Sequence, residues 1–125
     1  MASENQNLGF VRGRVRGGFI ALKGAYKFVT TEHSGMVQLV LVVLLTIAGF
    51  YYQISATEWM FHVIVVGIVL ATEALNTAIE KLCDFIHDDH HEKIGFVKDI
   101  AAGAVWFAAM AALTVEIIIF GPKIF

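Results

Sequence analysis

Three long apolar runs alternate with polar segments along the chain, and this pattern predicts three membrane-spanning helices. The runs cover residues 36–52, 59–70 and 100–120. A helix needs about 20 apolar residues to cross a bilayer. We therefore predict spans at residues 35–54, 58–80 and 98–120, with the second extending into the cytoplasm. Gly121-Pro122 is expected to end the third span, since proline cannot continue the backbone hydrogen bonds of a helix.

Residues 8–32 mix basic and apolar side chains, which predicts an amphipathic helix lying on the membrane surface. Gly17-Gly18 is expected to interrupt that helix. Its basic residues are Arg12, Arg14, Arg16, Lys23 and Lys27. The arginines alone support a second interpretation equally well, in which they form a charged flank that only sets the topology.

The distribution of basic residues predicts the orientation of the spans. Five basic residues precede the first span, three lie between the second and third (Lys81, Lys93 and Lys98), and only Lys123 follows the third. Cytoplasmic segments carry the excess of Lys and Arg, so the N-terminus is predicted inside and the C-terminus outside. The predicted fold is one all-α integral membrane domain over residues 1–125.

Composition agrees with this assignment and excludes other classes. Hydrophobic residues make up 58% of the chain and the mean hydropathy is +0.71. A net charge of −2 argues against nucleic-acid binding, which needs a basic surface. Three short spans cannot enclose a large site by themselves, so we expect a homo-oligomer.

The second predicted helix carries polar residues on one face. They are spaced three or four residues apart: Glu73, Asn76, Glu80 and Asp84. We call these four residues the acidic stripe. One interpretation is a face that meets water just outside the membrane. The other is a divalent-cation site, favoured because Glu73 lies among apolar residues, where an ionisable group is costly. With Glu32, Lys98 and Asp99 on the cytoplasmic side, the parts needed for phosphoryl transfer are present.

Other polar residues receive more modest interpretations. The cluster His87, Asp88, Asp89, His90, His91 and Glu92 is predicted to be a solvated loop, since no distant ligand pair completes a zinc site. His62 is expected to make a polar contact between helices. Glu116 is expected to reach the membrane surface or to bond across an oligomer interface.

The sequence EALNTAIE at residues 73–80, followed by Asp84, His91 and KDIAAGAV from Lys98, resembles the bacterial diacylglycerol kinase / undecaprenol kinase family. These are small three-span lipid kinases of the bacterial inner membrane, and the resemblance runs from about Phe10 to the end of the third span. It implies a homotrimer with shared sites and transfer of the γ-phosphate of ATP, with Mg²⁺, to a lipid hydroxyl. The motif from Lys98 is closer to the undecaprenol branch, but both lipids remain open.

The resemblance also implies roles for single residues. Glu73 would be the general base, with Asn76 orienting it, and Glu32 and Glu80 would hold the metal. Arg12 is taken as the arginine that reaches the phosphates, with Arg14 and Arg16 as alternatives. The full set implied to contact the nucleotide is Arg12, Glu32, Glu80, His91, Glu92, Lys98 and Asp99.

Two other functions fit the same residues. A small oligomeric transporter or channel would use the embedded Glu73, His62 and Glu116 as a proton or cation relay. A non-catalytic scaffold would use the small residues of the third span for helix packing.

Overall fold

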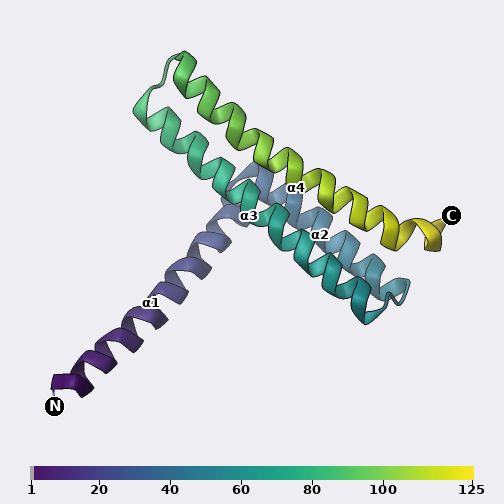
Figure 1. The fold of residues 1–125 in the computed structure, drawn as a ribbon, viewed down its shortest axis with the longest axis horizontal. Helices are drawn as coiled ribbons and strands as arrows, with labels where there is room; N and C mark the ends of the chain where they lie inside the picture. The colour runs from purple at the N-terminus through teal and green to yellow at the C-terminus, as the bar shows by residue number, and fades with distance from the viewer. Residues whose placement is uncertain (1) are drawn as a thin grey trace.

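The described residues 2–125 form four helices, and three of these are long and apolar enough to cross a membrane. The computed structural model describes residues 2–125, with side chains from residue 6 onward. The helices are α1 (Ala2–Thr31), α2 (His33–Tyr51), α3 (Ala56–Ile86) and α4 (Glu92–Ile124) (Figure 1). The candidate spans are α2, α3 and α4. The all-helical, three-span prediction is confirmed.

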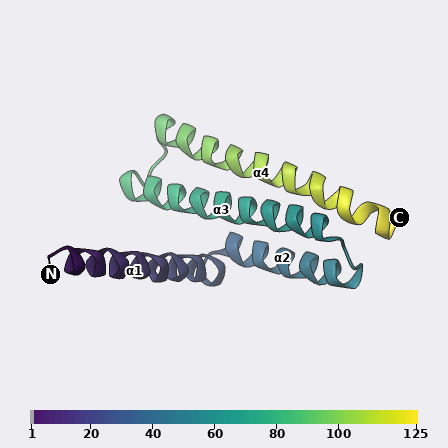
Figure 2. The ribbon, with the colours of Figure 1, turned by 60° about the horizontal axis from the view of Figure 1, so that its bottom comes forward.

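Helices α2, α3 and α4 form an antiparallel bundle, and α1 extends away from it (Figures 1 and 2). The central helix is α3, which packs most extensively against α4 and less extensively against α2. We name the two ends of the bundle by their turns: the His87 end, where α3 turns into α4, and the Ser55 end, where α2 turns into α3. The start of α2 lies beside the middle part of α3, short of the His87 end, and the C-terminus lies at the Ser55 end (Figures 1 and 2).

The small core lies at the Ser55 end. Ile54, Ile119 and Phe120 are buried there, and Trp59 and Tyr52 pack against them. Elsewhere the bundle turns large apolar side chains outward, and Phe107, for example, is 72% exposed. Such an outer surface suits hydrocarbon as a solvent and would be unusual facing water.

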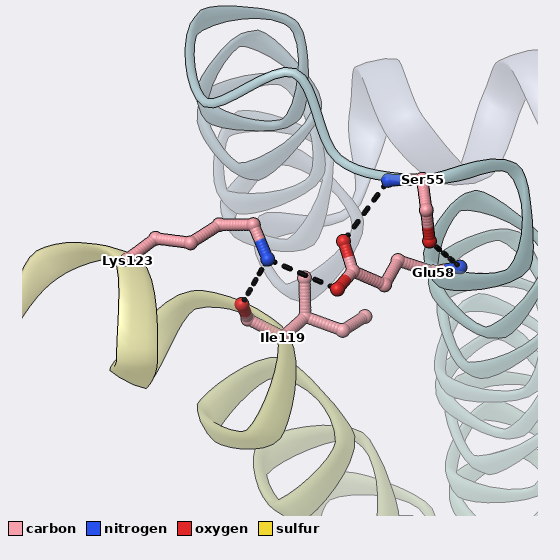
Figure 3. Close-up of polar contacts among 4 residues, drawn as sticks. All are labelled: Ser55, Glu58, Ile119 and Lys123. Atoms are coloured by element: carbon pink, nitrogen blue, oxygen red, sulfur yellow. Dashed lines mark hydrogen bonds and ion pairs between the residues drawn. The ribbon is translucent and has the colours of Figure 1, made fainter.

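Hydrogen bonds and an ion pair also join α3 to α4 at the Ser55 end (Figure 3). Ser55 caps α3 by accepting a hydrogen bond from the Glu58 backbone N–H at 3.2 Å, and the Glu58 carboxylate accepts from the Ser55 N–H at 3.0 Å. Lys123 Nζ of α4 donates to Glu58 Oε1 at 3.0 Å and to the Ile119 carbonyl at 3.1 Å. The start of α3 and the end of α4 are therefore held together.

One glycine is needed where α1 meets α2. A Cβ at Gly35 would collide with the backbone carbonyl of Phe28, which cannot move without shifting α1. Glu32 stands between the two helices with extended backbone angles, φ −96° and ψ 131°.

Three details of the prediction were wrong. Helix α1 runs through Gly17-Gly18 without a break. Helix α4 continues past Pro122 to Ile124, because a proline this near a helix end removes only one hydrogen bond, and Lys123 satisfies a nearby carbonyl. The polar segment 81–98, which we expect from the sequence to connect the second and third spans, is mostly helix, and only residues 87–91 link α3 to α4.

Candidate active site

The acidic stripe occupies the half of α3 toward the His87 end. Glu73 and Asn76 are half-buried, whereas Glu80 and Asp84 are exposed. Asn76 Nδ2 donates to Glu80 Oε1 at 3.2 Å, the contact that an i, i+4 spacing provides on a helix. Asn76 was expected beside Glu73, but its amide lies with Glu80.

Glu73 contacts a residue that the sequence analysis missed. Gln38 Nε2 of α2 donates to Glu73 Oε1 at 3.3 Å. One turn nearer the His87 end, the hydroxyls of Ser34 and Thr77 lie 3.3 Å apart. The signal for Gln38 was present, since it is the one amide within the apolar run MVQLVLVV. Among the side chains that the structure describes, none is hydrogen-bonded to the other oxygen, Oε2, of that carboxylate.

Glu32 lies close to the acidic stripe but faces a cation. Its Oε1 is 3.2 Å from Lys81 Nζ, in an ion pair whose side chains are 29% and 64% exposed. A pair this exposed is weak, on the order of 1 kcal/mol or less, so Glu32 can exchange partners at little cost.

The oxygen ligands around Glu80 fit Mg²⁺. Among the described residues, no group of three or more His, Cys, Asp or Glu side chains could hold a metal by itself. Mg²⁺ does not need one, because it is held by one or two carboxylates together with water and substrate phosphates. The buried Oδ1 of Asn76 has no hydrogen-bond partner within the described part of the chain, so a further hard oxygen lies beside Glu80.

The remaining predicted nucleotide residues lie around the His87 end. Lys98 Nζ of α4 pairs with Asp84 Oδ1 at 2.5 Å. His91 caps α4 by accepting from the Lys93 backbone N–H at 3.2 Å, and its ring lies 5.2 Å from that of His87. Glu92 and Asp99 are exposed on α4. These residues lie at the surface of the His87 end, next to the acidic stripe, together with exposed apolar side chains such as Phe85.

Arg12 does not lie near the acidic stripe of its own chain. It is exposed on α1, along with Arg14 and Arg16, and α1 leads away from the bundle (Figure 1). If an arginine of α1 completes the site, it must come from another copy or after a movement of α1.

A second polar group lies deep in the bundle, toward the Ser55 end. His62 Nδ1 and Glu116 Oε1 are 2.6 Å apart, and His62 Nε2 lies 3.1 Å from Thr46 Oγ1. His62 is 2% and Glu116 9% exposed. The helix-contact prediction for His62 is thus confirmed, but Glu116 bonds to His62 of the same chain and does not reach the membrane surface.

The relay proposed for a transporter is not continuous in this structure. Glu73 and His62 are eleven residues apart on α3, about 16 Å at 1.5 Å per residue. Glu73 bonds to Gln38 and His62 to Glu116 and Thr46, so the two groups are separate.

Comparison with known proteins gives two matches. A family model described as prokaryotic diacylglycerol kinase matches residues 19–120. An undecaprenol kinase of Bacillus subtilis (strain 168) is 34% identical over 102 residues, which cover 82% of this chain and 83% of that protein. The family match includes the acidic stripe, Glu32, Gln38 and Lys98, and it leaves out Arg12.

Proposed function

The chain belongs to the prokaryotic diacylglycerol kinase family, and from this premise we propose that it transfers the γ-phosphate of ATP to the hydroxyl of undecaprenol or diacylglycerol. The protein is a lipid kinase that crosses a bacterial membrane several times. The chemistry takes place at the cytoplasmic surface, where the lipid hydroxyl comes from the bilayer and the nucleotide from water.

Glu73 is the general base in this proposal, and its surroundings support the assignment. It is half-buried in a helix that is apolar on its N-terminal side, and Gln38 holds one of its oxygens. The other carboxylate oxygen accepts the proton of the lipid hydroxyl while the hydroxyl oxygen forms a bond to the γ-phosphorus. The bond between the γ-phosphorus and the bridging oxygen breaks, and ADP leaves with the electron pair.

Glu80 and Glu32 are the residues proposed to hold Mg²⁺, which neutralises phosphate charge when bound. The Asn76 amide orients Glu80 through the 3.2 Å hydrogen bond. For Glu32 to join, its carboxylate leaves the exposed pair with Lys81, which frees the lysine to meet a phosphate oxygen. Lys98, paired with Asp84, is a second cation at the same surface.

The proposed assembly is a homotrimer with its N-termini in the cytoplasm. The basic residues of α1 and those on either side of the α3–α4 turn (Lys81, Lys93 and Lys98) favour that orientation. Helix α1 lies along the membrane surface in this proposal, since apolar residues of its N-terminal two thirds, such as Phe19 at 70% exposed, are not covered by the bundle. A neighbouring copy then receives the arginines of α1 near its acidic stripe.

The test is transfer of label from γ-labelled ATP into extracted lipid by the purified protein. Undecaprenol and diacylglycerol are assayed separately in mixed micelles, with and without Mg²⁺. We expect labelled lipid phosphate that depends on Mg²⁺. Hydrolysis of ATP without any labelled lipid would refute the proposal.

A further inference from the structure

Three polar contacts join α2 to α3 beside the acidic stripe, and they follow one another in order along both helices. They are Gln38–Glu73 at 3.3 Å, Ser34–Thr77 at 3.3 Å and Glu32–Lys81 at 3.2 Å. On α3 the three residues are four positions apart, so successive contacts are separated by about 6 Å along one face of the helix. The outer two contacts contain the proposed base and a proposed phosphate contact. A pair of hydroxyls stands between them.

The hydroxyl pair keeps one proton that has no acceptor in the described part of the chain. Two hydroxyls carry two protons, and the single hydrogen bond between Ser34 and Thr77 uses one of them, whichever oxygen donates. Hydroxyls within helices often donate to the carbonyl four residues earlier. The threonines of this chain that do so are Thr30, Thr31, Thr72 and Thr114. Within the described residues, Ser34 and Thr77 bond only to each other, so the pair retains a donor for a further acceptor.

The hydroxyl pair lies at the level where the proposed reaction places the γ-phosphate. The lipid oxygen meets Glu73, and the γ-phosphorus has to approach that oxygen to about 3–3.5 Å before the two react. The nucleotide comes from the side of Lys81, and Thr77 lies midway between Glu73 and Lys81, about one helical turn from each. Ser34 and Thr77 are short and half-buried, so a phosphate oxygen reaches them between the longer neighbouring side chains.

We infer that the Ser34–Thr77 pair donates a hydrogen bond to the phosphoryl group while it is transferred. Negative charge is spread over the equatorial oxygens of that group in the transition state, and a donor held in place beforehand stabilises this charge without reorganisation. A hydroxyl carries no charge, so it leaves the basicity of Glu73 intact, whereas a cation at the same position would lower it. Neither hydroxyl loses its proton, and the bonds that form and break are those of the proposed transfer. The inference rests on the proposed lipid kinase function and adds two residues to its site.

The first test is the kinetics of the double variant Ser34→Ala/Thr77→Val, made in the full-length protein and assayed in mixed micelles. Both hydroxyls are replaced because either one, left alone, can turn its proton toward the phosphate. The readout is transfer of label from γ-labelled ATP to undecaprenol and to diacylglycerol. We expect kcat to fall by about tenfold or more, the value of one hydrogen bond to a charged group. The KM for ATP should stay within about twofold, because the bond forms during transfer.

Two further variants separate this effect from damage to the fold. Thr77→Ser keeps the hydroxyl, so its kcat should stay within about twofold of the unmodified protein. Thr72→Val is the matched control, because the Thr72 hydroxyl, on the same helix, donates to the Ile68 carbonyl at 2.9 Å. Its loss should leave kcat unchanged. A double variant whose kcat equals that of Thr72→Val overturns the inference.

A binding measurement distinguishes a phosphoryl contact from a contact that only joins α2 to α3. The probe is ADP with Mg²⁺, with and without aluminium fluoride, which mimics a phosphoryl group in transfer. In the unmodified protein, aluminium fluoride should tighten ADP binding roughly tenfold or more, as a transition-state analogue does. The double variant should lose most of this gain and keep its affinity for ADP alone. Equal losses of affinity with and without aluminium fluoride, or an undiminished gain, would overturn the inference.

The same measurement separates failure of this inference from failure of the kinase function. An unmodified protein that labels no lipid refutes the kinase function. If its aluminium fluoride gain still depends on Ser34 and Thr77, the two hydroxyls remain assigned to a phosphoryl site. If the protein labels no lipid and shows no such gain, both proposals are refuted.

Discussion

The contact between His62 and Glu116 should be the strongest polar coupling between the helices of the bundle. The two side chains are 3% and 11% exposed and their atoms approach to 2.6 Å. Loss of one partner leaves the other buried without its hydrogen bond, at a cost of about 1–3 kcal/mol. Loss of both leaves an apolar contact, which costs little. Each single change, His62→Leu or Glu116→Leu, should therefore lower the free energy of unfolding of the unmodified protein. The same change should lower it less when it is made in the protein that already carries the other substitution.

The coupling energy should reach about 1–2 kcal/mol, the upper end for polar pairs between membrane helices. Unfolding in mixed micelles by added denaturing detergent measures it, and fluorescence can follow it because the Trp59 ring lies 5.7 Å from that of His62. The pair Glu32–Lys81, with its lysine 64% exposed, is the matched control and should couple by less than about 1 kcal/mol. Equal coupling energies in the two pairs would show that burial does not strengthen the contact between His62 and Glu116.

Three further results are expected. Gln38→Leu should lower kcat by about five- to tenfold, the value of one hydrogen bond to Glu73, with KM for ATP unchanged; a changed KM alone would contradict this positioning role. Glu80→Gln should raise the Mg²⁺ concentration for half-maximal rate by about tenfold or more, and an unaltered Mg²⁺ titration would remove Glu80 from the metal site. Gly35→Val should destabilise the protein by about 2 kcal/mol or more in thermal unfolding, because the Phe28 carbonyl blocks a Cβ; wild-type stability would contradict the close approach.

The spans were predictable because solvent alone dictates them. Apolar runs such as residues 36–52 have few alternatives to a helix in a membrane, where backbone groups must bond to one another. The helix ends were not predictable in the same way. Residues 81–86 and 92–97 carry enough charge to leave the bilayer, yet they remain helical, so α3 and α4 continue beyond the apolar runs.

The site was predictable where its residues lie on one helix and less so where they come from several. The i, i+4 relation of Asn76 and Glu80 follows from spacing alone. The contacts of Gln38 with Glu73 and of His62 with Glu116 join residues 35 and 54 positions apart. Such pairs depend on how the helices rotate about their axes, and a mostly apolar helix surface does not specify that rotation.

The substitution Glu73→Gln tests whether Glu73 takes the proton of the lipid hydroxyl. The substitution keeps the shape of the side chain and removes its basicity. We expect kcat to fall by about 10²–10⁴, the contribution of a general base, while the dissociation constant for ATP stays within about twofold. Asp88→Asn, the same carboxylate-to-amide change in the exposed turn, should alter neither quantity. A Glu73→Gln enzyme whose kcat remains within tenfold of the unmodified protein would contradict the account.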